Sequence, residues 1–139
     1  MNKVAVIYWS GTGNTHVMAE AVAEGARGAG AEADLLTCAE VGNISDYDAL
    51  ALGCPAMGAE ELEDAEFLPM LEGIEPELVG KRVALFGSYG WGDGEWMRAW
   101  EARCQEKSMV LAADSVMANE APDDEALVAC RALGATLAE

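Results

Sequence analysis

The sequence predicts an α/β fold in which a five-stranded parallel sheet is covered by helices on both faces. Segments with strand and helix character alternate along all 139 residues, without a linker, a repeat or a low-complexity stretch. Three of the strand candidates are nearly unbroken apolar runs, which is typical of strands buried on both faces. Such strands alternating with helices form a doubly wound sheet. We therefore expect residues 1–139 to form a single domain.

The expected strands and helices follow from apolar runs and from helical spacing. The first, third and fourth strands are the apolar runs, and the whole set of strands covers residues 3–9, 32–37, 49–53, 82–87 and 110–117. Helical spacing appears at residues 14–29, 66–72, 94–106 and 123–138. Pro69 is tolerable in a first helical turn, and Gly30 is placed to end the first helix. The segment 110–117 runs straight towards the last helix, without an insertion.

The charge balance restricts the partners of the protein. The chain has 8 basic and 25 acidic side chains, a formal net charge of −17. This charge repels nucleic acid and anionic membranes and favours proteins with basic docking surfaces. The alternative is that most of these carboxylates are only solvated surface. Because the chain shows neither a signal sequence nor an apolar stretch long enough to cross a bilayer, we expect a cytoplasmic protein, and we expect a monomer.

The cysteines and the single histidine give no sign of a reactive centre. Cys38, Cys54, Cys104 and Cys130 lie far apart without a C-x-x-C pair, so we expect free thiols and no metal site. His16 follows the first strand on the first helix, where we expect a solvated position without a catalytic role.

A polar, glycine-containing segment follows the first apolar run. Residues 10–15 read Ser-Gly-Thr-Gly-Asn-Thr and lie between the first strand and the first helix. A loop in this position directs backbone N–H groups and a helix N-terminus towards one point, which suits a phosphate. The loop contains no lysine or arginine, whereas a nucleoside-triphosphate P-loop requires Gly-Lys-Ser/Thr after a longer spacer. We therefore predict a single phosphate that is held and not transferred, although an ordinary capped strand-to-helix turn would show the same residues.

Two further segments extend this pattern to a family resemblance. Residues 53–61 read Gly-Cys-Pro-Ala-Met-Gly-Ala-Glu-Glu, and residues 86–96 read Phe-Gly-Ser-Tyr-Gly-Trp-Gly-Asp-Gly-Glu-Trp. With residues 10–15 they resemble the three flavin-binding loops of flavodoxins, in particular the short-chain flavodoxins of anaerobic bacteria. The similarity covers essentially the whole chain. It implies strand order 2-1-3-4-5, which makes the strands before the three loops neighbours and lets the loops converge.

The resemblance also implies a function and a cofactor. It implies a low-potential one-electron carrier, not an enzyme, that binds FMN non-covalently and cycles between the semiquinone and the hydroquinone. The alternative is an NAD(P)H-dependent FMN reductase or quinone reductase, which would need additional loops and basic groups. A module that only senses phosphate is disfavoured by Trp91 and Met57, and a related phosphatase would need a C-x5-R motif.

The resemblance assigns roles to individual residues of the three motifs. Met57 and Trp91 match the two positions that flank the flavin ring, and Glu61 matches the carboxylate that accepts from flavin N3–H. The backbone of residues 57–59 matches the segment beside flavin N5. Asn119 matches a position near the pyrimidine edge or the ribityl chain, or it simply begins the loop to the last helix. Family members vary at Pro55 and Ala59. The expected FMN site comprises Ser10, Gly11, Thr12, Gly13, Asn14, Thr15, Pro55, Ala56, Met57, Gly58, Ala59, Glu61, Ser88, Tyr89, Gly90, Trp91 and Asn119.

Several carboxylates lie on or beside the second and third motifs. If they are near the cofactor, they should disfavour an additional negative charge on it and so lower its potential. The alternative is again that they are solvated surface. These residues are Glu60, Glu61, Glu63, Asp64, Asp93 and Glu95.

Overall fold

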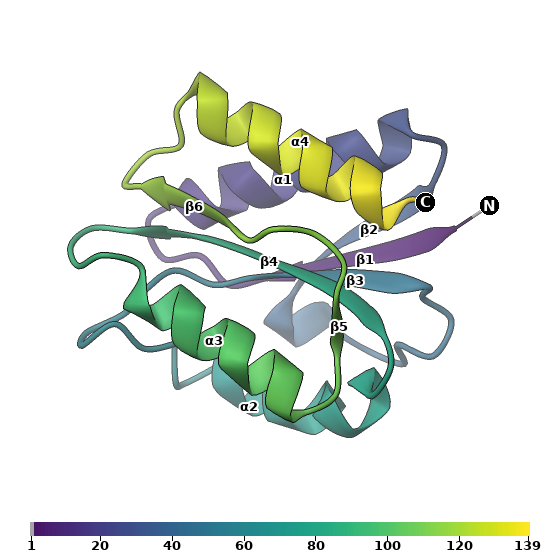
Figure 1. The fold of residues 1–139 in the computed structure, drawn as a ribbon, viewed down its shortest axis with the longest axis horizontal. Helices are drawn as coiled ribbons and strands as arrows, with labels where there is room; N and C mark the ends of the chain where they lie inside the picture. The colour runs from purple at the N-terminus through teal and green to yellow at the C-terminus, as the bar shows by residue number, and fades with distance from the viewer. Residues whose placement is uncertain (1) are drawn as a thin grey trace.

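The computed structural model, which describes residues 2–139, alternates strands and helices along the chain as predicted (Figure 1). In chain order the elements are β1 (Lys3–Tyr8), α1 (Asn14–Gly28), β2 (Glu32–Thr37), η1 (Cys38–Glu40), β3 (Ala49–Gly53), α2 (Phe67–Ile74), η2 (Glu75–Leu78), β4 (Arg82–Tyr89), α3 (Glu95–Glu106), β5 (Val110–Leu111), β6 (Val116–Asn119) and α4 (Asp124–Leu137).

The strands form one parallel sheet with the predicted order. The order is β2-β1-β3-β4-β5, and β6 also pairs with β4. Because all strands run the same way, their carboxyl ends lie at one edge of the sheet. The chain termini meet at the other edge, where the Asn2 side-chain amide donates to the carbonyl oxygens of Ala138 and Glu139, each at 2.7 Å. The edge with the carboxyl ends is thus free for a ligand site.

Two helical layers cover the sheet. In Figure 1, α1 and α4 lie over one face, and α2 and α3 lie under the other. The alternation along β1 shows why both faces are apolar, since Val4 and Val6 pack with α1 and α4, while Ala5 and Ile7 pack with α2 and α3. No helix within residues 2–139 combines the length and the apolar character needed to cross a bilayer.

The fifth strand differs from the prediction of one continuous segment over residues 110–117. It is divided into β5 and β6, which both pair with β4. Arg82 is paired with Val110, and Phe86 is paired with Val116. Phe86 is four residues after Arg82, whereas Val116 is six residues after Val110. The two extra residues bulge out of the ladder. Ser115 lies in this bulge and donates its hydroxyl to Glu101 Oε2 of α3 at 2.6 Å.

Candidate functional site

Three loops meet at the carboxyl edge of the sheet. We call them the Gly11 loop (residues 9–13), the Met57 loop (residues 54–61) and the Trp91 loop (residues 90–94); they follow β1, β3 and β4, which are neighbours in the sheet. Between them lies a cleft of about 310 Å³. It is lined by Trp9, Gly11, Thr12, Asn14, Pro55, Ala56, Met57, Ser88, Tyr89, Gly90 and Glu120. The predicted convergence of the three motifs is therefore present in the structure.

The Gly11 loop leaves backbone donors free at the start of α1. The hydroxyl of Ser10 accepts from the Gly13 N–H at 3.1 Å, and Gly13 has a left-handed φ of 98°. Within residues 2–139, the N–H groups of Gly11, Thr12 and Thr15 have no protein acceptor. Free donors around a helix N-terminus fit a phosphate group without any cationic side chain.

Trp9 is a wall of this cleft, although the sequence predicted only that it ends a strand. Its ring packs over Gly11 so closely that a Cβ there would lie 3.0 Å from the ring. Trp9 also lines a second cavity of about 670 Å³, together with Ser10, Gly13 and His16. Trp9 therefore borders both cavities.

Thr15 connects α1 to β4 and does not line the cleft. Its side chain is buried, and its hydroxyl lies 3.2 Å from that of Ser88 in β4. It also accepts from the Ser88 N–H at 3.4 Å. The Thr15 hydroxyl thus ties α1 to β4, and its contact with a phosphate stays a prediction.

The Met57 loop is held by β4 on one side and by its own turn on the other. The N–H groups of Cys54 and Ala56 donate to the carbonyl oxygens of Phe86 at 3.1 Å and Ser88 at 3.0 Å. Met57 and Glu61 exchange two backbone hydrogen bonds of 2.8 and 2.9 Å, which close a tight turn with Gly58 at a φ of 50°. This turn holds the Met57 side chain at the cleft, where it is 37% exposed.

Neither Glu60 nor Glu61 lines the cleft. Glu61 lines a separate groove of about 560 Å³ beside Trp96 and Trp100, and Glu60 borders the same groove. The Glu60 carboxylate reaches the Trp91 loop, where it accepts from the Gly94 N–H at 3.3 Å. Of the two neighbouring acids, Glu60 is therefore the one beside the Trp91 loop, which the residue assignment from the sequence did not anticipate.

Glu63 is a structural anchor, which differs from both sequence-based interpretations, an acid that acts on the cofactor and a solvated surface residue. Its side chain is buried, and its two carboxylate oxygens accept from the N–H groups of Ala65 at 2.9 Å, Glu66 at 2.8 Å and Phe67 at 2.7 Å. Burial acts to raise the pKa of Glu63, but the three N–H groups outweigh it and hold the pKa below its usual value. The carboxylate thus fixes the start of α2.

The Trp91 loop presents a large apolar side chain to solvent. Trp91 is 65% exposed and is followed by two glycines with left-handed φ, Gly92 at 90° and Gly94 at 92°. Asp93 in the same loop is paired with Arg98 of α3 at 2.9 Å. An exposed indole beside a cleft is available to cover a flat ligand.

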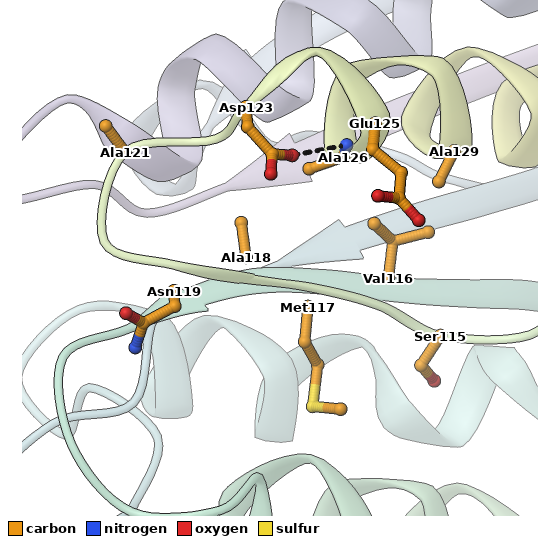
Figure 2. Close-up of a pocket in the computed structure, with 10 residues that line it drawn as sticks. All are labelled: Ser115, Val116, Met117, Ala118, Asn119, Ala121, Asp123, Glu125, Ala126 and Ala129. Carbon is orange, nitrogen blue, oxygen red and sulfur yellow. Dashed lines mark hydrogen bonds between the residues drawn. The ribbon is translucent and has the colours of Figure 1, made fainter.

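Asn119 lies on the side of β6 that faces away from α4. In Figure 2, Val116 and Ala118 point towards α4, whereas Met117 and Asn119 point the other way. The pocket of about 490 Å³ in this view is lined by residues of β6, including Asn119, and of α4, whereas Asn119 does not line the cleft between the three loops. The Asn119 side-chain amide donates to the carbonyl oxygen of Tyr89 at 3.3 Å, which ties β6 to the end of β4.

The His16 side chain is 42% exposed but also contacts the end of β1. Its Nδ1 lies 2.7 Å from the Tyr8 hydroxyl, and the two rings are 5.2 Å apart. Burial, with the negative charges of Glu40 and Glu20, raises the pKa of Tyr8 and so keeps its hydroxyl protonated. His16 therefore braces the first turn of α1 against the end of β1.

The thiols are free, as predicted. Burial raises the pKa of Cys38 to about 11 and that of Cys54 to about 12, so both remain protonated at neutral pH. Cys104 and Cys130 are also free and buried. Among residues 2–139, no group of three or more His, Cys, Asp or Glu side chains is arranged to hold a metal ion.

Comparisons with known proteins agree with this geometry. Residues 6–134 match the family model described as flavodoxin. The chain belongs to the flavodoxin family. It is 41% identical over 138 residues to the flavodoxin of Megasphaera elsdenii, covering 98% of both chains, and 45% identical over 122 residues to that of Clostridium beijerinckii, covering 86% of this chain and 88% of the other. The solution structure of two-electron reduced Megasphaera elsdenii flavodoxin superposes with a TM-score of 0.87 at 42% identity, covering 97% of this chain and 98% of that one.

Membership of the family establishes the class of function. This flavodoxin is an FMN-binding electron carrier and not an enzyme, as the three motifs predicted. Because these two relatives are named flavodoxins, the comparisons do not favour the alternative of an NAD(P)H-dependent FMN reductase or quinone reductase. The residues at the cleft fit FMN, because free backbone donors adjoin a cleft with an apolar thioether and an exposed indole at its margin.

Proposed function

We propose that the cleft between the three loops is the FMN site of this flavodoxin, with the phosphate on the Gly11 loop and the flavin ring between the Met57 and Trp91 loops. The observation that supports this most strongly is the set of free N–H groups at Gly11, Thr12 and Thr15, of which the first two belong to residues that line the cleft. Hydrogen bonds to a phosphate dianion are charge-assisted, so about 1.5 to 3 kcal/mol each would suffice without a lysine or arginine.

The two large side chains at the margin would cover the flavin ring. Met57 supplies a flexible thioether from a rigid turn, and Trp91 supplies a flat aromatic face. Both are more exposed than core residues, which supports a role in covering a ligand. The backbone of residues 88–90 would line the rest of the ring and the sugar chain.

We assign the acidic contact at the edge of the ring to Glu60 in place of Glu61. Both acids line the groove beside Trp96 and Trp100, but the Glu60 carboxylate also reaches the Trp91 loop, where it accepts from the Gly94 N–H. Asn119 acts on the site indirectly, through its hydrogen bond to the Tyr89 carbonyl. The Thr15 hydroxyl likewise supports the site by holding Ser88.

FMN supplies the redox chemistry when it is bound, because the protein has only to hold the ring and set its electrostatic surroundings. Carboxylates around the cleft disfavour a negative charge on the reduced cofactor, so the carrier works at low potential. The net charge of −17 favours redox partners with basic docking surfaces and opposes self-association, which supports a monomer. Four free thiols suit the reducing conditions of the cytoplasm.

The proposed site is tested by titrating the apoprotein with FMN, riboflavin and FAD. FMN should bind most tightly, because riboflavin leaves the free donors of the Gly11 loop without an anion. Thr12→Ala should weaken FMN but not riboflavin, whereas Ser45→Ala, an exposed hydroxyl far along the chain, should change neither. Equal affinities for FMN and riboflavin in the unmodified protein would refute the phosphate assignment.

A further inference from the structure

The sheet has two edges, and β5 and β6 form one of them. Both strands pair with β4 on one side only, whereas β2 forms the other edge. In Figure 1 the edge with β5 and β6 is nearest to the viewer, between α4 above and α3 below. An edge strand presents backbone N–H and C=O groups that no neighbouring strand meets, and such groups can pair with a strand of another chain.

The direction of the backbone groups along β6 follows from one hydrogen bond. The Glu120 N–H donates to the Tyr89 oxygen of β4 at 2.7 Å. Successive residues of a strand turn their backbone groups to opposite sides, so Met117 and Asn119 turn theirs away from β4. Within residues 2–139, no hydrogen bond outside the pairing of β4 with β6 engages the backbone N–H or C=O of Met117 or Asn119.

The opposite edge of the sheet is protected by side chains of the chain itself. The Glu32 N–H donates to the β1 side, so Ala33 and Thr37 of β2 turn their backbone groups outwards. There the Ala33 oxygen accepts from the Arg27 guanidinium at 2.8 Å, and the Thr37 N–H donates to Glu40 Oε1 at 2.9 Å. Groups that are occupied in this way are not available to a further strand. The outward groups of Met117 and Asn119 have no such partners among the described residues, so β6 is the edge that can accept a strand.

The pocket of about 490 Å³ beside β6 indicates the chemistry of the partner (Figure 2). Residues of β6 that point to either side line it, as expected for a groove along the backbone of an edge strand. From α4 it receives the small side chains of Ala126 and Ala129, and its charged lining residues are Asp123 and Glu125. Asp123 caps α4 through the Ala126 N–H at 2.8 Å, but the exposed Glu125 has no ion pair within residues 2–139. Residues 112–130 contain five acids and no lysine or arginine, so the surroundings of the groove favour a basic partner.

We propose that the free edge of β6 and this groove dock an extended segment of another protein that contains lysine or arginine. The backbone of the segment pairs with Met117 and Asn119, the aliphatic stems of its basic side chains cover the alanines of α4, and their charged ends reach Glu125. A second copy of this chain does not fit, because each copy would bring the same acids to the contact. The groove and the cleft between the three loops share no lining residue, so the proposal goes beyond the proposed FMN site and does not depend on it.

The test adds the peptide acetyl-Lys-Val-Lys-Val-Lys-Val-amide to the isotope-labelled, FMN-loaded protein at low salt and follows the backbone amide signals by NMR. The largest changes should fall on β6 and on the start of α4, and the N–H groups of Met117 and Asn119 should exchange with water more slowly. The control peptide has proline in place of each valine. It carries the same charge but cannot pair as a strand, so it should bind at least about fivefold more weakly. Equal affinities of the two peptides, or changes confined to the three loops, would overturn the proposal.

Met117→Pro tests the backbone pairing from the side of the protein. It removes an N–H that points outwards, so it leaves the pairing with β4 intact, and an edge strand tolerates proline in such a position. Met117→Pro should weaken binding of the valine peptide at least about fivefold, whereas Met117→Ala keeps the N–H and should stay within about twofold. The same affinity in both variants would show that docking does not use the edge of β6. Because the two peptides are compared on the unmodified protein, the proposal can be rejected even if Met117→Pro does not fold.

Glu125→Gln tests the basic character of the partner. It should weaken the valine peptide about two- to fivefold at low salt and less at higher salt. Glu77→Gln is the matched control, because it removes the same charge from an exposed position in η2, which does not line the groove. Equal losses in the two variants would mean that the peptide responds only to net charge, which would overturn the docking site. Signals of β6 that shift with protein concentration in the absence of peptide would assign the edge to a second copy of this chain and overturn the choice of partner.

Discussion

The indole N–H of Trp96 donates to the carbonyl oxygen of Cys54 at 3.1 Å, in the buried space between α3 and the start of the Met57 loop. The same ring lies 5.5 Å from the ring of Tyr89. Gly87 allows this arrangement, because a Cβ there would overlap the Cys54 carbonyl. Trp96 therefore fixes the Met57 loop relative to the end of β4.

Trp96→Phe should lower the free energy of unfolding by more than Trp100→Phe. Both indoles are 1% exposed, so both substitutions remove similar buried area, but Trp100 Nε1 has no hydrogen-bond partner within the described residues. Only Trp96→Phe leaves a buried carbonyl without its donor, which costs about 1 to 3 kcal/mol. Urea denaturation of both apoproteins measures the difference. Equal losses would show that the Trp96 hydrogen bond does not contribute, and a weaker FMN affinity confined to Trp96→Phe would support its role in placing the loop.

Glu63→Gln should destabilise the apoprotein by about 1 to 3 kcal/mol at pH 7. The carboxylate accepts from three backbone N–H groups with two oxygens, whereas a glutamine side chain has a single acceptor oxygen. The folded state holds the pKa of Glu63 below its usual 4.5, so its charge stabilises the fold above about pH 4.5. This contribution is lost as the pH falls through the lower, folded pKa. The stabilities of the unmodified protein and of Glu63→Gln should therefore converge in acid.

Urea unfolding at pH 7 and at about pH 3 checks the Glu63 prediction. Glu66→Gln is the control, since Glu66 is exposed three residues further on and does not take part in the anchor with its side chain. A constant difference in stability between Glu63→Gln and the unmodified protein at both pH values would argue against a charged anchor.

The sheet order and the meeting point of the loops could be predicted because the signals are local. Each of β1, β3 and β4 is an apolar run that ends in glycine, hydroxyl or amide residues, and the family motifs add the order of the strands. The division of the fifth strand was missed because it depends on pairing with β4, which lies about 30 residues earlier in the chain. The adjacent Asp114 and Ser115 were the only local sign of a break.

The individual roles of side chains were harder to predict. Glu63 lies among exposed acids, and its burial depends on where α2 begins, which the periodicity placed one residue too early. The Thr15 hydroxyl faces Ser88 because of the way α1 crosses the sheet, which no local pattern records. Trp9 and Glu120 reach the cleft from outside the motifs, through the packing at Gly11 and the attachment to Tyr89.

Trp91→Ala should weaken FMN binding by about 1 to 3 kcal/mol, the scale of stacking between an aromatic ring and a planar base. The stability of the apoprotein should hardly change, because Trp91 is 65% exposed. Val128→Ala removes a similarly exposed apolar side chain from α4, at 63%, and should leave FMN binding unchanged. If Trp91→Ala destabilised the apoprotein but left its affinity for FMN unchanged, Trp91 would be a packing residue.

Gly58→Ala should alter how FMN affinity depends on the redox state of the cofactor. The family resemblance implies that the peptide between Gly58 and Ala59 turns on reduction, so that its carbonyl accepts from flavin N5. Gly58 has a φ of 50° with open space where a Cβ would lie, so the substitution adds backbone strain without a clash. Gly30 has a φ of 95° and equally open space, which makes Gly30→Ala the matched control. Both variants should lose about 1 kcal/mol of stability, but only Gly58→Ala should change the ratio of affinities for oxidised and one-electron-reduced FMN. If Gly58→Ala and Gly30→Ala showed the same ratio of affinities, the turn of the peptide between Gly58 and Ala59 on reduction would be rejected.

The combined variant Asp64→Asn/Asp93→Asn should raise the potential for the last electron and slow electron transfer to a basic partner. A carboxylate about 10 Å from the ring disfavours an added negative charge by about 0.4 kcal/mol in water, and screening at about 0.1 M salt reduces this to roughly 0.15 kcal/mol. For two carboxylates the shift is therefore about 30 mV at low salt and about 15 mV at 0.1 M. Asp93 is paired with Arg98, so its removal also frees a cation, which acts in the same direction.

The control for the acidic pair is Asp46→Asn/Glu77→Gln. It removes the same charge from the segments that precede β3 and β4, at the edge of the sheet opposite the cleft. Potentiometric titration at two ionic strengths, with stopped-flow transfer to a basic acceptor protein, compares the two variants. Because both carry the same net charge, a larger and salt-dependent shift in Asp64→Asn/Asp93→Asn must come from the position of its charges. Equal shifts in the two pairs would mean that the acids beside the cleft act only through the net charge of the molecule.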